Sequence, residues 1–595
     1  MTTSTPPRRT VDIIDRRVGL LFGAFLLLLL VAVARAGYLG LFRGSALRQA
    51  ANAQQVQTAP IPAPRGEITD RNDVVLALSQ PADEINADPI LITRTYKHPQ
   101  TVADKLAPLL HMTRSSTLKD LTKPNTGYIT LATVSPRVAT EITALNVNGI
   151  SPPVPTERRV YPRGTEAAQV IGWTGTNGHG LLGLEDVFNK KLAGVSGARR
   201  SVLDAQGKPI SVTTAKAMVP GKNLALTISA PLQSEVEQVL AGVGAQYQPA
   251  GATAIVTDPQ TDQILALANW PAVNPNALHS DPFKAVGGQV PAAEDQAVDM
   301  SYEPGSTFKA ITVAGALQDG VVTPHTMFDI PPYLEVYGHK ISDAEVHGYE
   351  NLTVAGILKY SSNIGAVLIG QKLGSTPELA AQRFGYWVNR FGFGKPTGVS
   401  LPGEQMGLVR PVGGYSGLSM YNLPFGQGES VTPMQMVQAY DAIADGGILR
   451  RPQIVDSLGG KKVSEPQGKR IISAHVASQL RGMLRGVFAD GGTASGAAIS
   501  GYDLAGKTGT ASVVVNGKYS DSDYIASFIG MVPASDPKLV VAVVVNYPKG
   551  VIYGGSVAAP AFQKIVGWAV PHFGINPCPS PCPSSALNPA VPSTP

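Results

Sequence analysis

One uncharged, apolar run near the N-terminus limits how the rest of the chain can fold. Val18 to Ala34 carries no charged side chain and is rich in leucine at its centre. In a helix this run extends about 26 Å, slightly less than the ~30 Å hydrocarbon core of a bilayer, and the apolar residues from Gly37 to Phe42 lengthen it. Arginines precede the run, which predicts a single-pass helix with the N-terminus inside; they are Arg8, Arg9, Arg16 and Arg17.

A cleaved signal peptide is the alternative interpretation of this segment. Ala34-Arg35-Ala36 resembles the small-residue site at which such peptides are cut. The apolar run is long for a signal peptide, which favours an uncleaved anchor. We therefore expect a short cytoplasmic tail over residues 1–17, a transmembrane anchor over residues 18–42, and an extracytoplasmic remainder held at the cytoplasmic membrane.

Length and composition predict a globular, multidomain remainder. A chain of 595 residues is too long for one ordinary core, so at least two domains are expected outside the membrane. Hydrophobic residues make up 44% and charged residues 15%, which is typical of folded protein. The net charge of +5 is small and forms no basic stripe, which argues against nucleic-acid binding. The scattered histidines and the two cysteines form no metal-binding pattern, so we expect neither metal nor cofactor.

Three short strings, far apart in the chain, carry candidate chemistry. Each string alone is weak evidence, because it fits a helix cap, a helix boundary or a solvated strand lysine equally well. All three in one order, at domain-scale spacing, predict a serine acyl-transferase that uses lysine as its base. The strings are Ser306-Thr307-Phe308-Lys309, Ser361-Ser362-Asn363 and Lys507-Thr508-Gly509-Thr510.

The first string supplies the candidate nucleophile. Pro304 and Gly305 predict a turn, and a helix-compatible run from Ala310 follows, so Ser306 is expected at a helix N-terminus. Residues three apart share a helix face, which places Lys309 beside Ser306. A lysine takes the proton of a serine hydroxyl only when burial or nearby cations lower its pKa. We therefore expect Ser306 to be the nucleophile and Lys309 its proton acceptor.

The second string follows a segment, Leu352 to Tyr360, that looks like the end of a helix. Its position suits a loop that faces the nucleophile. Ser361 can relay a proton towards a leaving group, and Asn363 can hydrogen-bond a substrate amide.

The third string opens an expected strand, Lys507 to Val515. Asn516-Gly517 predicts a hairpin turn, Tyr524 to Val532 the return strand, and Leu539 to Asn546 a further strand. Lys507 would project at a sheet edge, and Gly509 would leave room for a substrate backbone. Thr508 and Thr510 offer hydroxyls to a substrate carboxylate.

Earlier segments predict further elements. We expect a strand from Gly221 to Ala230 at the entry to a second domain, and a hairpin made of Ala252–Thr257 and Gln263–Ala268. Ser135 to Leu145 is amphipathic. Glu185-Asp186-Val187-Phe188 resembles a string of peptidoglycan glycosyltransferases, but the companion motifs of those enzymes are missing, so no such site is expected.

Together these strings resemble the class B penicillin-binding proteins, which are monofunctional D,D-transpeptidases of bacterial cell-wall synthesis. The similarity runs from about residue 18 to about residue 570 and includes strings outside the candidate site. These are Arg65-Gly66-Glu67-Ile68-Thr69-Asp70-Arg71-Asn72, Arg159-Val160-Tyr161-Pro162, Gly183-Leu184-Glu185 and Phe425-Gly426-Gln427-Gly428.

The resemblance implies a reaction and its partners. Ser306 would be acylated by a stem peptide ending in D-Ala-D-Ala, and the amine of a neighbouring stem would release the acyl group. The backbone N–H groups of Ser306 and Thr510 would hold the oxyanion, and Lys507, Thr508 and Thr510 would hold the donor's carboxylate. β-Lactams would acylate the same serine. A separate polytopic glycan polymerase and the other proteins of the division machinery are the expected partners.

The resemblance also completes the expected architecture. We expect a multidomain α/β protein in which an elongated mixed α/β pedestal, or dimerisation domain, occupies residues 43–220. A transpeptidase domain with a five-stranded antiparallel sheet flanked by helices would occupy residues 221–575. A Pro/Ser-rich tail, residues 576–595, is expected to be disordered, and its Cys578 and Cys582 form either a local disulfide or nothing structural.

Other functions stay open at this point. Phe391 to Gly398 and the compact pedestal favour septal synthesis over an elongation-type transpeptidase. A D,D-carboxypeptidase would use the same residues with water as acceptor. A β-lactamase would need a deacylating base, and no E-x-x-L-N string lies between Asn363 and Lys507. A penicillin-binding sensor or scaffold without catalysis is the alternative from another class.

Overall fold

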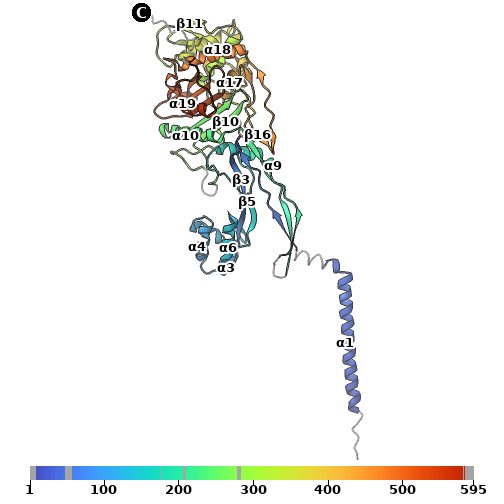
Figure 1. Ribbon diagram of the computed structural model, residues 1–595. Coiled ribbons are helices and arrows are strands. Elements are labelled where there is room, and N and C mark those ends of the chain that lie inside the picture. The colour runs from blue at the N-terminus through green and yellow to red at the C-terminus, as the bar shows by residue number, and fades with distance from the viewer. Residues whose placement is uncertain are drawn as a thin grey trace, which may run out of the picture. The chain divides into compact units, whose positions relative to one another are not determined.

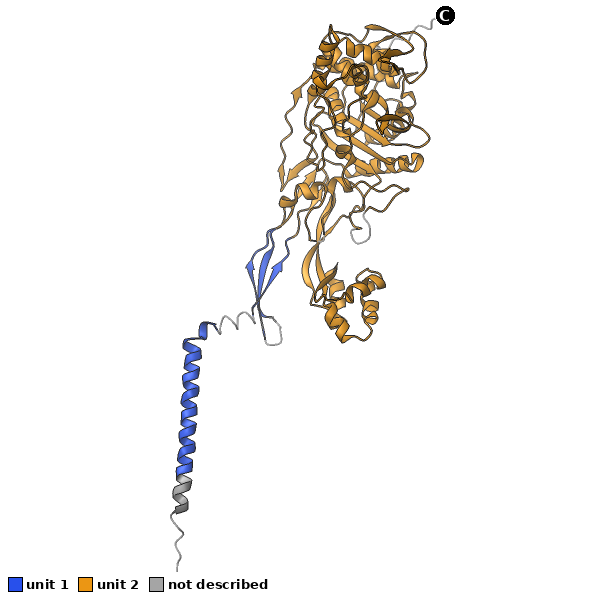
Figure 2. Ribbon diagram, turned by 180° about the vertical axis from the view of Figure 1, so that it is seen from behind, with its two compact units in different colours: residues 1–63, 195–219 blue, residues 64–194, 220–595 orange. Residues whose placement is uncertain are grey.

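The computed structural model describes residues 9–46, 56–175, 177–204, 209–277, 283–579 and 582 (Figure 1). The chain forms two compact units (Figure 2). The smaller comprises residues 1–63 and 195–219, and the larger comprises residues 64–194 and 220–595.

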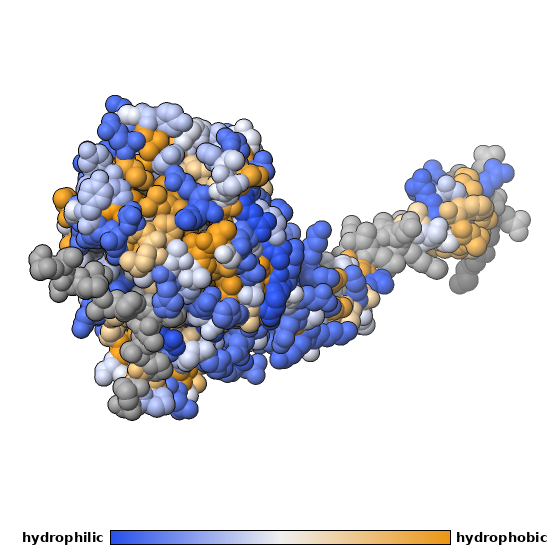
Figure 3. All heavy atoms as spheres, turned by 90° about the horizontal axis from the view of Figure 1, so that it is seen from above, coloured by the Kyte–Doolittle hydropathy of each residue, from blue (hydrophilic) through white to orange (hydrophobic). Residues whose placement is uncertain are grey.

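The smaller unit consists of one long helix and a small sheet. Helix α1 spans Arg9–Leu41, and the window Arg16–Leu41 is long and apolar enough to cross a membrane. Its leucine and phenylalanine side chains are exposed, whereas the face of the larger unit in Figure 3 intersperses hydrophilic and hydrophobic residues. The antiparallel sheet has the order β1-β6-β7, with bounds Val56–Ile61, Gly197–Leu203 and Pro209–Lys216.

A seven-stranded sheet begins the larger unit. Its order is β17-β16-β8-β2-β3-β4, with β5 also paired to β3; only β2 and β8 are parallel. The strands are β2 Ile68–Thr69, β3 Val75–Ala87, β4 Ile129–Val134, β5 Val154–Val160, β8 Leu224–Leu226, β16 Val455–Leu458 and β17 Lys461–Lys462. Four helices pack beside β3 and β4 around a small core of their own: α3 Pro89–Thr95, α4 Gln100–Leu109, α5 Arg114–Leu121 and α6 Pro136–Ala144. Helix α6 confirms the amphipathic segment.

The strand expected from Gly221 to Ala230 is largely wrong. Only the three residues of β8 form a strand, and they pair with β2 and β16 rather than with the second sheet. Helix α10 (Ala230–Tyr247) begins where the strand was expected to end, with a proline in its first turn. Between β8 and α10, Thr227 Oγ1 donates to the backbone oxygens of Ile264 and Gln453. This part of the segment is therefore an irregular connection and not a continuation of the strand.

The second sheet has five strands, all antiparallel, as expected. Its order is β10-β9-β21-β20-β19, and β19 lies at one edge. The strands are β9 Gly251–Asp258, β10 Gln263–Trp270, β19 Ala505–Val515, β20 Lys518–Val532 and β21 Leu539–Asn546. The predicted hairpins over β9–β10 and β19–β20 are confirmed, the latter turning at Asn516 and Gly517, both with positive φ.

Helices cover both faces of this sheet. Along β21, Val541, Val543 and Val545 belong to one core cluster, and the residues between them belong to the other. The first cluster includes α10 and α19 (Gly554–His572), and the second includes α12 (Lys309–Gln318), α17 (Pro433–Ala444) and α18 (Ala474–Leu484). Burial on both faces explains why β21 is apolar without alternation.

Shorter elements complete the larger unit. The helices are α7 Ala168–Ile171, α8 Gly183–Val187, α9 Asn189–Leu192, α11 Gln296–Asp299, α13 Val354–Tyr360, α14 Asn363–Gln371, α15 Pro377–Arg390 and α16 Ser419–Asn422. The strands are β11 Met327–Ile330, β12 Leu334–Val336, β13 His339–Ile341, β14 Glu350–Thr353, β15 Ile448–Leu449 and β18 Lys469–Arg470.

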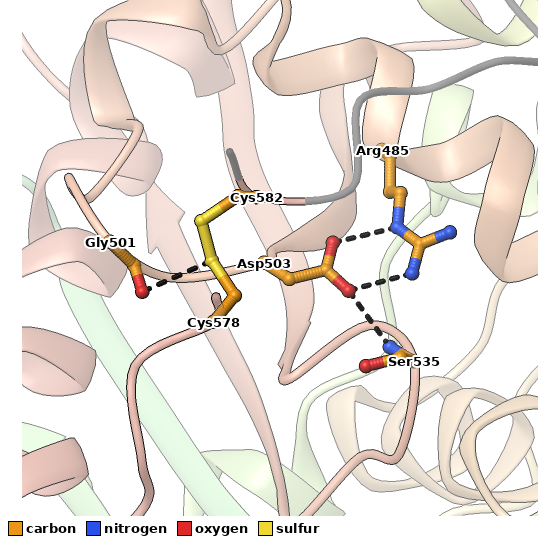
Figure 4. The surroundings of a disulfide bond; sticks show 6 residues. All are labelled: Arg485, Gly501, Asp503, Ser535, Cys578 and Cys582. Carbon is orange, nitrogen blue, oxygen red and sulfur yellow. Dashed lines mark hydrogen bonds and ion pairs between the residues drawn. A yellow bond between two sulfur atoms is a disulfide. The ribbon is translucent and has the colours of Figure 1, made fainter. Parts of the chain in front are cut away.

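The first residues of the C-terminal tail are attached to the larger unit. Cys578 and Cys582 form a disulfide, and the Sγ of Cys578 lies 3.2 Å from the oxygen of Gly501 (Figure 4). The backbone N–H of Cys578 also donates to the oxygen of Gly501, at 2.8 Å. Close by, Asp503 pairs with Arg485 at 2.6 Å, just before β19 begins. The expectation of disorder is therefore wrong for residues 576–579; for residues 580, 581 and 583–595 it lies outside the described residues.

A buried ion network joins the N-terminal strings of the larger unit. Glu185 is fully buried, and its two carboxylate oxygens accept from Arg65 at 2.5 Å and from Arg159 at 2.6 Å. Arg65 also donates to the backbone oxygen of Glu185 at 2.7 Å and to Asn189 at 2.8 Å. Glu185 is thus engaged by two guanidinium groups, which suits a structural carboxylate and not a general base.

Removing Glu185 should therefore destabilise the protein. Glu185→Ala leaves two buried guanidinium groups without their carboxylate, a loss that typically costs about 3–5 kcal/mol. Thermal unfolding of the purified chain should show a clearly lower Tm. The matched control is Arg137→Ala, which breaks an exposed ion pair with Glu141 and should change stability by less than about 1 kcal/mol. Equal changes in Tm for the two substitutions would contradict a stabilising role of Glu185.

Candidate active site

The structure brings the three strings to one place. Ser306 lies in the 3-10 turn Gly305–Phe308 that leads into α12, Ser361 lies between α13 and α14, and Lys507 lies on edge strand β19. The amine of Lys507 donates to Ser361 Oγ at 2.9 Å, and the amine of Lys309 donates to the same oxygen at 3.2 Å. Ser361 is thus the meeting point of all three segments.

Packing fixes the turn that carries Ser306. Gly305 has φ +54°, and a Cβ there would lie 3.2 Å from the Thr510 oxygen, so the turn is pressed against β19. The N–H of Gly305 donates to the oxygen of Gly426 at 3.0 Å. The buried hydroxyl of Tyr440 donates to the Thr307 oxygen at 2.8 Å. The expected helix N-terminus is thus confirmed, with one 3-10 turn preceding the α-helix.

The side chain of Ser306 is partly exposed. Among the described residues, no hydrogen bond joins its hydroxyl to Lys309 or Lys507, whose amines donate to Ser361, Asn363 and Thr508. The expected direct contact between Ser306 and Lys309 is therefore not formed in this conformation. Catalytic hydrogen bonds are often long or absent in the free enzyme and tighten only when substrate is bound, so this geometry does not exclude Lys309 as the base.

Lys309 is fully buried, which excludes its interpretation as a solvated lysine. Its amine donates to the Ser361 backbone oxygen at 2.5 Å and to Asn363 Oδ1 at 2.7 Å. Burial lowers the pKa of Lys309 to about 7, and the negative charge of Asp343 partly opposes that shift. A substantial share of Lys309 is therefore neutral near neutral pH and able to accept a proton.

Lys507 is also fully buried, on the edge strand. Burial lowers its pKa well below the ordinary value of 10.5, and the neighbouring Lys309 lowers it further. Because Ser361 Oγ accepts from both amines, its own proton is free to be donated elsewhere. This arrangement suits a proton relay from the lysines through Ser361.

Asp343 is a residue of this site that the sequence did not single out. Its Oδ2 accepts from Ser362 Oγ at 2.6 Å, and its Oδ1 accepts from the backbone N–H groups of Asn363 and of Ile364, the latter at 3.0 Å. The neighbouring Ser342 oxygen accepts from Asn363 Nδ2 at 3.0 Å, which turns Oδ1 of that amide towards Lys309. Asp343 thus holds the second string in place from the N-terminus of α14.

The third string packs against the protein along its length. Thr508 Oγ1 lies 2.8 Å from Thr493 Oγ1, and Thr510 Oγ1 accepts from the N–H of Gly554 at 3.0 Å. A Cβ at Gly509 would lie 2.3 Å from Ser527 Oγ. The close approach that requires glycine here is therefore made by the protein's own β20.

Two buried amines with no carboxylate partner within ion-pair distance, among the described residues, should reduce stability. Since the folded pKa of Lys507 lies below its unfolded value, the unfolded chain binds the extra proton between the two values, and stability rises with pH there. Lys507→Met should therefore raise stability at pH 7 by about 1–4 kcal/mol.

Thermal unfolding at pH 7 and at pH 10 measures this effect. The gain in Tm should be larger at pH 7 than at pH 10, and Lys518→Met, at an exposed position of β20, should give no gain at either pH. A lower Tm for Lys507→Met at pH 7 would show that its hydrogen bonds outweigh its desolvation.

Most of the chain is similar in sequence to penicillin-binding proteins. The family model for the penicillin binding protein transpeptidase domain matches residues 252–567, and that for the penicillin-binding protein dimerisation domain matches residues 60–226. The chain is 33% identical to the peptidoglycan D,D-transpeptidase FtsI of Escherichia coli K12, over 97% of this chain and 95% of that protein. Stage V sporulation protein D of Bacillus subtilis 168 is 33% identical, over 94% of this chain and 85% of that protein.

Solved structures show the same fold. Penicillin binding protein 3 of Mycobacterium tuberculosis, complexed with ampicillin, superposes with a TM-score of 0.67 at 28% sequence identity. The match covers 89% of this chain and 100% of that chain.

Proposed function

This chain belongs to the class B penicillin-binding proteins, and we propose that it is the serine D,D-transpeptidase that cross-links peptidoglycan stem peptides in septal cell-wall synthesis. One observation carries the proposal: two fully buried lysines from distant strings donate to the hydroxyl of Ser361, and the first shares a turn with Ser306. Such a site activates a serine without a histidine.

The acylation step assigns one role to each group. Ser306 Oγ attacks the carbonyl carbon of the penultimate D-Ala, and neutral Lys309 takes the hydroxyl proton. The C–N bond then breaks, and the departing D-Ala amine receives a proton passed on through Ser361. Asn363 binds a substrate amide. The backbone N–H groups of Ser306 and Thr510 hold the oxyanion, an interaction worth about 10²–10³ in rate per donor.

Resolution of the acyl-enzyme uses the same groups in reverse. The amine of a second stem attacks the ester carbon, gives up a proton to the lysine–serine relay, and forms the cross-link as Ser306 regains its proton. Lys507, Thr508 and Thr510 bind the donor's terminal carboxylate, with Gly509 between the two threonines. A β-lactam offers a similar carboxylate and a strained amide, so it acylates Ser306 and blocks the site.

The arrangement that we propose for the rest of the chain puts this chemistry outside the cell membrane. Residues 1–17 form the cytoplasmic tail and residues 18–42 the anchor, with the N-terminus inside as the preceding arginines favour. Residues 43–220 form the pedestal and residues 221–575 the transpeptidase domain. The chain makes no glycan strands, so a polytopic glycan polymerase and the division machinery are its partners.

Covalent labelling tests the nucleophile. Ser306→Ala should abolish labelling by fluorescent penicillin, whereas Ser301→Ala, an exposed serine five residues earlier, should leave it unchanged. The unmodified chain, supplied with a polymerase and lipid-linked precursor, should also form cross-linked product that Ser306→Ala lacks. Labelling without any product would favour a sensor or a scaffold, and released D-Ala without cross-links would favour a carboxypeptidase.

The rate of acylation should depend on pH through Lys309. Because only the neutral amine accepts a proton and its pKa is about 7, the second-order rate constant for benzylpenicillin should fall by about tenfold per pH unit well below that value. Stopped-flow or quenched labelling between pH 5 and 9 gives the profile. A rate that stays constant down to pH 5 would exclude Lys309 as the base.

A further inference from the structure

A histidine on the segment between β13 and β14 contacts Asp343, the carboxylate that holds the second string. His347 Nε2 lies 3.2 Å from Asp343 Oδ2, and its Nδ1 lies 2.7 Å from the backbone oxygen of Gly348. The side chains of His347 and Asp343 are only 12% and 11% exposed. The ring is therefore held on both edges in a mostly buried position.

Both neighbours of the ring are hydrogen-bond acceptors. A backbone carbonyl cannot donate, and the Asp343 carboxylate, which already accepts three hydrogen bonds from the second string, is an acceptor as well. A neutral imidazole would set one lone pair against one of these oxygens. Only an imidazolium, with a proton on each nitrogen, satisfies both contacts.

Asp343 connects this ring to the base. It holds Ser362 and the backbone of Asn363, and the amide of Asn363 in turn accepts from Lys309 at 2.7 Å. Its negative charge also acts on Lys309 directly, since it raises the pKa of that amine. A cation on the far side of Asp343 offsets this charge and therefore favours the neutral amine.

We propose that His347 is a positioning residue for acylation: as an imidazolium it clamps Asp343 and neutralises the charge that this carboxylate projects onto Lys309. The inference rests on the proposed function. Among the described residues, Asp343 is the only carboxylate within ion-pair distance of the ring; beyond it lie the amines of Lys309 and Lys507. The second string facing it from α14 contributes only hydroxyl and amide groups.

Two substitutions separate the charge of His347 from its shape. His347→Gln keeps a donor for Asp343 but loses the cation, so Lys309 should hold its proton to higher pH. The fall in the benzylpenicillin acylation rate at low pH, the acid limb of the profile, should move to higher pH. The rate at pH 7 should be reduced about threefold to tenfold, and the rate at pH 9 should change little. His347→Arg keeps a cation with several donors and should retain the limb near its original position.

A second histidine provides the control for these substitutions. His339→Gln, at an exposed position of β13, should leave the profile unmoved, and thermal unfolding checks that each variant is folded. A merely structural role would lower the rate of both His347 variants equally at every pH without moving the limb. An unmoved limb in His347→Gln, or an upward shift in His347→Arg equal to that in His347→Gln, would overturn the inference.

The unmodified chain distinguishes this failure from that of the proposed function. If benzylpenicillin does not acylate Ser306 in the unmodified chain, the proposed function itself fails. If acylation occurs with an acid limb and the His347 variants leave that limb in place, only the role of His347 is lost.

Discussion

The burial of two lysine amines around one serine hydroxyl is the constraint on which the site depends. Water would keep Lys309 and Lys507 protonated, and a protonated Lys309 accepts nothing. Three segments must therefore close over them: the turn that carries Ser306, the junction of α13 and α14, and the edge strand β19. The hydroxyl of Ser361 and the amide of Asn363 then provide neutral partners in place of solvent.

The molecule treats buried charge in two opposite ways. In the network of Glu185, Arg65 and Arg159, each guanidinium faces a carboxylate oxygen, so one negative charge partly compensates two positive charges and the network holds strands and loops together. Around Ser361 the hydrogen bonds of the two amines go to neutral acceptors, and only the more distant charge of Asp343 partly offsets the desolvation of Lys309. The first arrangement serves stability, whereas the second gives up stability for reactivity, as active sites often do. Apolar packing on both faces of the five-stranded sheet offsets the stability that is lost at the site.

Much of this could be predicted from local sequence, because local rules and tertiary packing agree there. The strands β20 and β21, the turn at Asn516-Gly517 and the start of α12 follow from hydrophobic runs, turn residues and a proline–glycine pair. Distant partners left no such signal. Asp343 lies in an irregular segment and meets the start of α14, about 20 residues later, only in the folded chain. Strand β8 pairs with strands far along the chain, which a local pattern does not reveal. The ordered start of the tail lies against Gly501, which is far from it in the sequence.

The position of β19 at the open edge of its sheet has a consequence for what the protein can recognise. An edge strand leaves every second N–H and C=O without a partner, so an extended peptide can join it as an additional strand. The protein would recognise such a ligand mainly through hydrogen bonds to the ligand's main chain. The side chains of the ligand would point alternately towards and away from the lysines. Chain direction and stereochemistry would then matter more than side-chain identity, which suits a ligand made of small D-amino acids.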